Sequence, residues 1–232
     1  MGNRCFSDPI PFTARLGRIS AGVLFALASN LAGNTALSAP SPSDWNEPAP
    51  LEKWHGQSTE ARFQRWREII ANGLDADALD QLREVNDFFN GARFVTDQEV
   101  YGVPDYWATP TEFITRDAGD CEDFAIAKYF TLKAMGVDIA KLRITYVKSL
   151  TLNQAHMVLA YYPTPDAEPL ILDNLNRLIK AASQRTDLRP VYSFNTEALW
   201  LSRTRNEQIK TGDPARLEQW RKVVARLDPE LR

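Results

Sequence analysis

Cys121 is the side chain of this 232-residue chain best suited to act as a nucleophile. It follows Gly119 and Asp120, a helix breaker and a good N-cap, and apolar residues then recur at helical spacing until Gly136. Cys121 is therefore predicted in the first turn of a buried helix, where backbone N–H groups and the helix dipole stabilise a thiolate. The alternative is a small apolar residue filling the core, the commoner role of a free cysteine.

His156 lies on a predicted strand, whereas the other histidine, His55, falls in an irregular N-terminal segment. A hairpin centred between Thr164 and Pro165 would place Asp173 directly opposite His156. Opposed side chains have Cβ atoms ~4.5–5.5 Å apart, so the carboxylate would hold an imidazole N–H. The alternatives are a histidine that is satisfied in the core and an aspartate that only caps the following turn. Together, Cys121, His156 and Asp173 supply a thiolate, a base and an acceptor that orients the base.

The N-terminus has the pattern of an export signal, with arginines before the apolar segment Ile19–Leu31 and a cleavage site at Ala36–Ala39. An inner-membrane anchor or a disordered tail is the alternative, although the apolar segment is shorter than the ~20 residues of a membrane span. We therefore expect a signal peptide at 1–39, a linker or arm at 40–56 and one domain at 57–232.

Removal of the signal would also remove Cys5 and leave Cys121 as the only cysteine of the exported chain. An oxidising compartment attacks an idle exposed thiol, so a single unpaired cysteine there favours a catalytic role.

Composition is that of an ordinary globular protein, with 44% hydrophobic and 25% charged residues. The net charge of −3 provides no basic surface, so we expect no nucleic-acid partner.

Helical patterns come first and strand patterns follow, which predicts an α+β fold. A polar and aromatic loop is expected over residues 97–115, before the cysteine helix, where it would line a site. Helices are predicted from Ser58 or Thr59 to Gly73, from about Leu79 to Asn90, from Asp120 to Gly136 and from about Pro214 to Leu227. Strands are predicted at Phe94–Thr96, Leu142–Lys148, Ala155–Tyr162 and Leu170–Asp173, with a weak one near Val191.

Three acidic residues, Asp120, Glu122 and Asp123, surround the cysteine. Their charge opposes thiolate formation, and a bound calcium ion would offset it because calcium prefers clustered carboxylate oxygens. Stabilisation of the helix N-terminus by acids is the alternative that needs no metal.

The order Cys, His, Asp resembles that of the transglutaminase-like branch of the papain-type cysteine proteases. The similarity covers roughly residues 50 to 202 and is closest to the bacterial transglutaminase-like cysteine proteinases. The runs that carry it are Asp105–Pro110, Ala118–Tyr129, Leu152–Tyr161, Leu172–Asn174, Val191–Asn195 and Leu199–Leu201. The fold implied is papain/transglutaminase-like, with N-terminal helices packed on an antiparallel sheet.

The resemblance implies Cys121 as the nucleophile, His156 as general base and acid, and Asp173 as its orienting partner. It also implies calcium dependence through acids that flank the cysteine, here Asp120 and Glu122, with Asp123 as a further candidate. The oxyanion would be held by the Cys121 backbone N–H and a second donor from the preceding loop, for which we consider Trp107 and Gln98.

Members of this family are periplasmic and cut a large surface adhesin near its N-terminus, which releases cells from biofilms. An inner-membrane receptor for cyclic di-GMP sequesters the protease through its periplasmic domain. The resemblance thus implies a periplasmic protein with these two partners and no direct membrane insertion after signal removal. A protein-glutamine transglutaminase and a non-catalytic binding module of the same fold are the alternative functions.

Overall fold

The computed structural model describes residues 57–202 and 208–232. The expected signal peptide, 1–39, and linker, 40–56, lie outside the described residues. The first two predicted helices are confirmed as α1 (Thr59–Gly73) and α2 (Ala78–Asn90). Each begins where a side chain, Ser58 or Asp77, accepts a backbone N–H of the first turn.

Residues 97–115 are not the continuous loop that we predicted. They contain α3 (Asp97–Val100) and α4 (Pro110–Arg116). Both helices begin with a capping box, in which a threonine is followed three residues later by a glutamate. These two local signals in the sequence outweigh the polar composition that indicated a loop.

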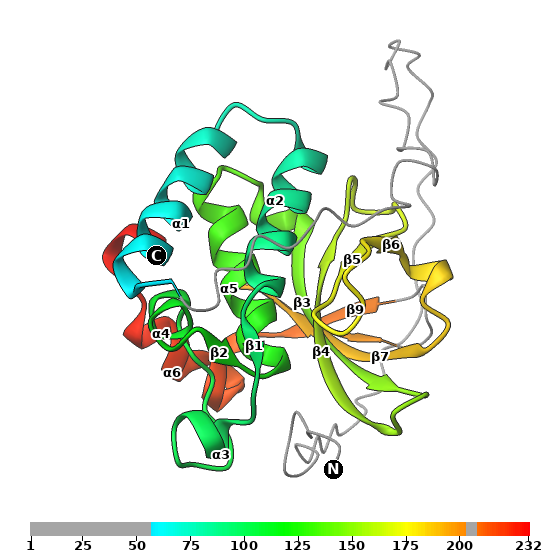
Figure 1. The fold of residues 1–232 in the computed structure, drawn as a ribbon. Coiled ribbons are helices and arrows are strands. Elements are labelled where there is room, and N and C mark those ends of the chain that lie inside the picture. Colours follow the sequence, from blue (N-terminus) through cyan, green and yellow to red (C-terminus); the bar gives the residue numbers. More distant parts are fainter. Residues whose placement is uncertain (1–56, 203–207) are drawn as a thin grey trace, which may run out of the picture.

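The cysteine helix is α5 (Cys121–Ala134), and it forms the centre of the molecule. All its side chains from Cys121 to Leu132 are buried, because α1, α2 and α4 pack on it from one side and strands β3 and β4 from the other. Figure 1 shows this helix between the other helices and the sheet. A helix enclosed on all sides needs apolar residues all round, and α5 accordingly has no strongly polar face.

The short strand β2 (Ala118–Gly119) leads into α5 and pairs in parallel with β1 (Arg93–Phe94). The backbone N–H of Val95 also donates to the carbonyl of Gly119, at 2.9 Å. This pairing fixes the chain directly before Cys121.

The second half of the described chain forms a seven-stranded antiparallel sheet in the order β6-β5-β4-β3-β7-β8-β9. The α+β class and the packing of helices on an antiparallel sheet are thereby confirmed. The strands are β3 (Leu142–Ser149), β4 (Gln154–Tyr161), β5 (Leu170–Leu172), β6 (Lys180–Ala181), β7 (Leu188–Phe194), β8 (Leu199–Ser202) and β9 (Gln208–Gly212).

The register between β4 and β5 differs from our prediction. Leu159 pairs with Leu172, so the register is shifted by two residues from the expected one and Asp173 is not directly opposite His156. Because side chains alternate with a period of two, a two-residue shift leaves both residues on the same face. The two residues are therefore diagonal neighbours, a separation that long side chains can bridge.

The sheet buries apolar side chains on both faces. One face joins the main core with α5, and the opposite face holds a smaller cluster that includes Val147, Val158 and Ile171. Strands β8 and β9 extend the sheet beyond the strands that we predicted. The C-terminal α6 (Glu218–Arg226) begins later than expected and packs Trp220 and Val223 into the main core.

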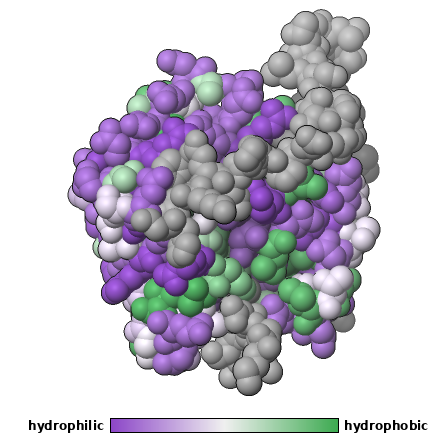
Figure 2. All heavy atoms as spheres, in the orientation of Figure 1, coloured by the Kyte–Doolittle hydropathy of each residue, from purple (hydrophilic) through white to green (hydrophobic). Residues whose placement is uncertain are grey.

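Figure 2 shows one face of the molecule, on which hydrophobic residues gather in the lower part, below a largely hydrophilic region. Among the large apolar side chains that remain exposed are Leu150 and Leu152, between β3 and β4, and Leu175, just after Asp173. The surface near the strand ends that carry His156 and Asp173 is thus partly apolar. Within the described ranges, no helix has the length and hydropathy that crossing a bilayer requires.

Gly119 provides a test of how tightly the start of α5 is packed. A Cβ atom at this position would lie 2.5 Å from Asp123 Oδ2 and 2.8 Å from Phe113 Cδ2. We expect Gly119→Ala to lower the free energy of unfolding by about 1–3 kcal/mol, the cost typical of an overpacked core. Urea titration measures it.

The matched control is Gly212→Ala, since the nearest atom to a Cβ there is Arg216 Nη1 at 3.6 Å, an ordinary contact. Equal stability of the two variants would show that the entrance to α5 has room that the structure does not indicate.

Candidate active site and metal centre

Cys121 is the first residue of α5 and its side chain is fully buried. A capping box formed by Asp120 and Asp123 holds the helix start, so the position of the sulfur is fixed by the backbone. The thiol Sγ donates to Glu122 Oε2 at 3.2 Å. In this arrangement a carboxylate holds the thiol proton.

His156, on β4, is hydrogen-bonded to Asp173 at the end of β5. Its Nε2 lies 2.8 Å from Asp173 Oδ1, and both side chains are about 1% exposed. Burial of a carboxylate is costly unless it is paired, so this contact is a strong local constraint. The structure thus brings His156 and Asp173 together, although not through the register that we predicted.

Asp173 has three further partners. Arg185 Nη2 donates to Oδ2 at 2.7 Å, the Leu175 backbone N–H donates to Oδ1 at 2.9 Å, and Asn90 Nδ2 donates to the backbone carbonyl at 2.9 Å. Burial alone would raise the pKa of the Asp173 carboxyl, but the charges of His156 and Arg185 and these hydrogen bonds hold that pKa well below its ordinary value. Asp173 therefore stays ionised.

The helix that carries Cys121 packs against the strand that carries His156, since α5 contacts β4. Tyr146, on the neighbouring strand β3, stands opposite Met157, the residue after His156. Burial raises the pKa of Tyr146, and the negative charges of Cys121 and Glu122 raise it further. Cys121 is therefore close to the two strands at the positions next to His156.

Tyr146 also stacks on Tyr192 of β7, with ring centroids 5.0 Å apart and nearly parallel planes. Burial raises the pKa of Tyr192, and the neighbouring Tyr146 and Glu122 add to this shift. The two rings form an aromatic wall beside the start of α5.

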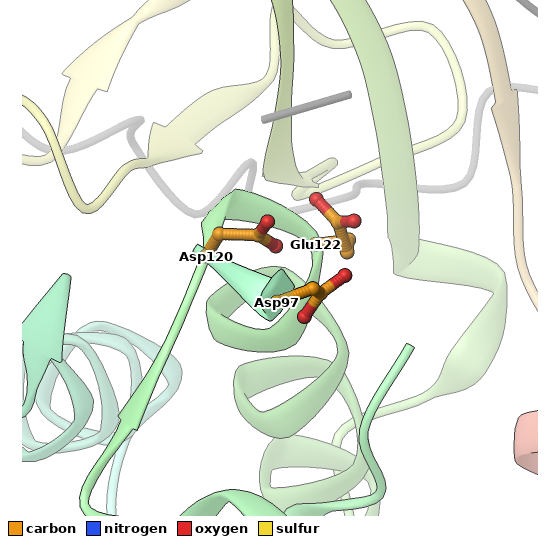
Figure 3. A group of neighbouring side chains, drawn as sticks. All are labelled: Asp97, Asp120 and Glu122. Carbon is orange, nitrogen blue, oxygen red and sulfur yellow. The ribbon is translucent and has the colours of Figure 1, made fainter. Parts of the chain in front are cut away.

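Asp97, Asp120 and Glu122 form a buried group of carboxylates that could hold a metal ion. One oxygen from each lies within 4.8 Å of the others. Figure 3 shows the three side chains gathered at the N-terminal end of α5, with Asp97 contributed by the separate segment that begins α3. A set made only of carboxylate oxygens suits a hard cation such as calcium.

Asp123, our third candidate ligand, is adjacent to this group but is not part of it. Its carboxylate accepts the backbone N–H of Ala108 at 2.7 Å and that of Asp120 at 3.3 Å. Burial raises its pKa well above the ordinary value, and the nearby Asp97 carboxylate adds to this effect. The structure therefore gives Asp123 a role in shaping the helix start and brings Asp97 into the carboxylate group instead.

The two candidates for the second oxyanion donor lie in different surroundings. Trp107 is 2% exposed and its ring stacks on Phe194, whereas Gln98 is an exposed residue of α3. Trp107 is also tied to the C-terminal helix, because its carbonyl accepts Arg226 Nη2.

Lys128, on α5, is a fully buried cation behind this site. Its Nζ donates to Asn86 Oδ1 at 2.9 Å and to Asn90 Oδ1 at 2.8 Å. Asn90 in turn holds the backbone of Asp173. Burial lowers the pKa of Lys128 from 10.5 to about 7, while the carboxylates of Asp173 and Asp87 oppose the shift.

Sequence reasoning missed Asp97, Arg185 and the wall of Tyr146 and Tyr192. A signal for Asp97 was present, since the capping box from Thr96 to Glu99 starts a helix at that position. No local pattern marks Arg185, whose partner Asp173 lies 12 residues before it.

A family profile and solved structures both relate this chain to the same family of proteins. A sequence profile of the family described as bacterial transglutaminase-like cysteine proteinase (BTLCP) matches residues 54–207. No curated protein matches the chain.

The solved structures that match include Legionella pneumophila LapG in two states. The EGTA-treated form is 51% identical, covers 73% of this chain and 90% of that chain, and has a TM-score of 0.67. The calcium-bound form is 49% identical, covers 74% of this chain and 92% of that chain, and has a TM-score of 0.66.

Lys128→Met tests the buried cation. The unfolded chain keeps its lysine proton to about pH 10.5, whereas folded Lys128 loses it near pH 7. The unfolded state therefore binds more protons between these values, and the free energy of unfolding of the wild type should rise with pH across this window relative to the variant. Urea titrations at pH 7 and pH 10 measure the difference.

Lys210→Met, at an exposed lysine of β9, is the control and should track the wild type at both values. If the difference in the free energy of unfolding between the wild type and Lys128→Met is the same at pH 7 and pH 10, the burial of a titrating amine is contradicted.

Proposed function

The chain belongs to the bacterial transglutaminase-like cysteine proteinases, and from this premise we propose that it is a periplasmic, calcium-dependent endopeptidase that cuts the N-terminal region of a large surface adhesin. Membership of the family makes the chain a cysteine protease. The adhesin, the periplasmic location, the control of biofilm attachment and release, and sequestration by an inner-membrane cyclic di-GMP receptor are parts of the proposal.

The observation that carries the catalytic assignment is the buried hydrogen bond between His156 Nε2 and Asp173 Oδ1. An aspartate that binds one ring nitrogen fixes the tautomer and leaves the other nitrogen, Nδ1, for proton transfer. Cys121 is the one cysteine among the described residues, which supports it as the residue that this imidazole serves.

In the proposed reaction, His156 takes the Cys121 proton and the sulfur attacks a peptide carbonyl to form a tetrahedral oxyanion. The backbone N–H of Cys121 and a second donor, Trp107 or Gln98, stabilise this oxyanion. His156 then gives its proton to the leaving amine, and an acyl-enzyme remains. Water, deprotonated by His156, attacks the thioester, releases the carboxylic acid and restores the thiol.

Calcium would be held by Asp97, Asp120 and Glu122, whose donor chemistry fits a hard cation. Support for calcium in place of other hard cations comes from the related LapG, which has been solved in a calcium-bound state. A bound cation would supply positive charge that offsets three carboxylates beside Cys121.

An extended segment of a protein substrate suits the exterior of this site. The exposed leucines Leu150, Leu152 and Leu175 stand near the strand ends that carry His156 and Asp173, and they offer apolar contacts to a chain that lies across them. The export pattern of residues 1–39 supports the periplasmic location.

Cys121→Ala should abolish cleavage while the protein stays folded, because alanine fits the first turn of a helix and only the sulfur is lost. The measurement is mass spectrometry of a library of peptides that contain Ala-Ala, the sequence at which the resemblance to the family implies cleavage, after incubation with either protein and calcium. Full activity of Cys121→Ala would remove the nucleophile from the proposal.

A labelled primary amine in the same reaction separates hydrolysis from transamidation. We expect shorter peptides without incorporated amine. Amine attached to intact glutamine-containing peptides would instead indicate a transglutaminase.

Asp97→Asn should weaken calcium binding about 10-fold or more, because a carboxylate of the donor set becomes neutral. Isothermal titration calorimetry measures the affinity without reference to activity. Glu99→Gln is the matched control, since Glu99 is an exposed acid of the same short helix. Equal affinities for the two variants would exclude Asp97 as a ligand.

A further inference from the structure

Arg185 is a buried cation that contacts Asp173 on the oxygen not used by His156. Its Nη2 donates to Asp173 Oδ2 at 2.7 Å, while His156 Nε2 and the Leu175 N–H occupy Oδ1. Arg185 as a residue is 3% exposed. Both carboxylate oxygens are thus engaged, so the group cannot rotate without losing a charge-assisted hydrogen bond.

Arg185 is itself fixed by a second carboxylate. Its Nε and Nη2 donate to Asp187 Oδ1 and Oδ2 at 3.0 and 2.8 Å, in a bidentate contact. The backbone N–H of Arg185 also donates to the carbonyl of Ala182, at 3.1 Å. The hydrogen bonds to two carboxylates offset the free-energy cost of removing the guanidinium from water. Because the guanidinium is planar, these bonds hold it in one orientation.

These hydrogen bonds form a chain that runs from Asp187 through Arg185 and Asp173 to His156. We infer that Arg185 is a positioning residue for the proposed reaction: it fixes the rotation of the Asp173 carboxylate and thereby holds the His156 imidazole in one tautomer. The expected effect of Arg185 on the reaction rate rests on the proposed function. The expected effect of Arg185 on the His156 tautomer does not.

Lys128 does not duplicate this role. Its hydrogen bond to Asn90 links it to the backbone carbonyl of Asp173, and this contact does not fix the rotation of the carboxylate. A lysine at position 185 would restore one hydrogen bond to Asp173 but could not bridge two carboxylates as the planar fork does.

The kinetic test compares Arg185→Met, Arg185→Lys and the control Arg189→Met, which removes the same charge from an exposed position of the adjacent strand. With a cleaved peptide as substrate, Arg185→Met should lower kcat roughly 10- to 100-fold with little change in KM, by analogy with the loss typical when the hydrogen-bond partners of metal-bound histidines are removed. Arg185→Lys should recover part of this loss, and Arg189→Met should match the wild type.

The spectroscopic test follows the imidazole directly. The chain has two histidines, so in a His55→Gln background the nitrogen NMR signals of labelled histidine report on His156 alone. We expect one tautomer, protonated at Nε2, in the wild type and in Arg189→Met, and a mixture of tautomers in Arg185→Met. Where Arg185→Met does not fold, Asp187→Asn, which removes only the outer carboxylate, should give a smaller change of the same kind.

An unchanged tautomer and unchanged kcat in a variant that only melts earlier would show that Arg185 is merely structural and would overturn the inference. Failure of the proposed function is distinguishable, since it appears as cleavage by Cys121→Ala and leaves the NMR result intact.

Discussion

The burial of one ionised carboxylate, Asp173, is the constraint on which the site depends. A charge with about 1% exposure is stable only where every oxygen is matched by a donor. Its partners come from four parts of the chain: His156 on β4, Arg185 before β7, Asn90 at the end of α2 and the backbone N–H of Leu175. The helices and the sheet must therefore be in their native arrangement before the imidazole is oriented.

A second group of buried charges lies beside Cys121, at the start of α5. Asp97, Asp120 and Glu122 converge at the start of α5, next to the sulfur that we propose as the nucleophile. Carboxylates at a helix N-terminus are favourable for the helix, but they oppose the formation of a thiolate beside them. These carboxylates thus oppose the charged form of the sulfur, and a bound cation would offset their effect. This conflict gives a physical reason for a hydrolytic site to need a metal that takes no part in bond making.

Much of the fold could be predicted from the sequence, because its signals are local. Capping residues mark α1 and α2, and alternating β-branched residues mark β3. The register of β5 could not be predicted, since the connection from β4 contains three prolines and its centre is not set by a turn of known type. The face of Asp173 was nevertheless correct, because an even shift preserves alternation.

The residues of the site likewise fall into those with a local signal in the sequence and those without one. Cys121 and His156 are recognisable by residue type, and Asp173 by a charge that ends an apolar strand. Arg185 and the stacked pair of Tyr146 and Tyr192 depend on contacts between distant segments, which leave no periodic trace in the sequence. Asp97 is intermediate, since its helix has a local signal but its approach to Glu122 depends on the packing of α3 at the entrance to α5.

The central claim is that one imidazole, oriented by a buried carboxylate, exchanges a proton with the sulfur at the start of α5. A crystal structure of the calcium-loaded protein trapped with a peptide aldehyde tests it most directly. The account predicts a covalent bond from Cys121 Sγ to the aldehyde carbon, with His156 Nδ1 in hydrogen-bond reach of the adduct and Nε2 still bound to Asp173. An adduct on another residue, or an imidazole that stays out of reach of the adduct, would contradict it.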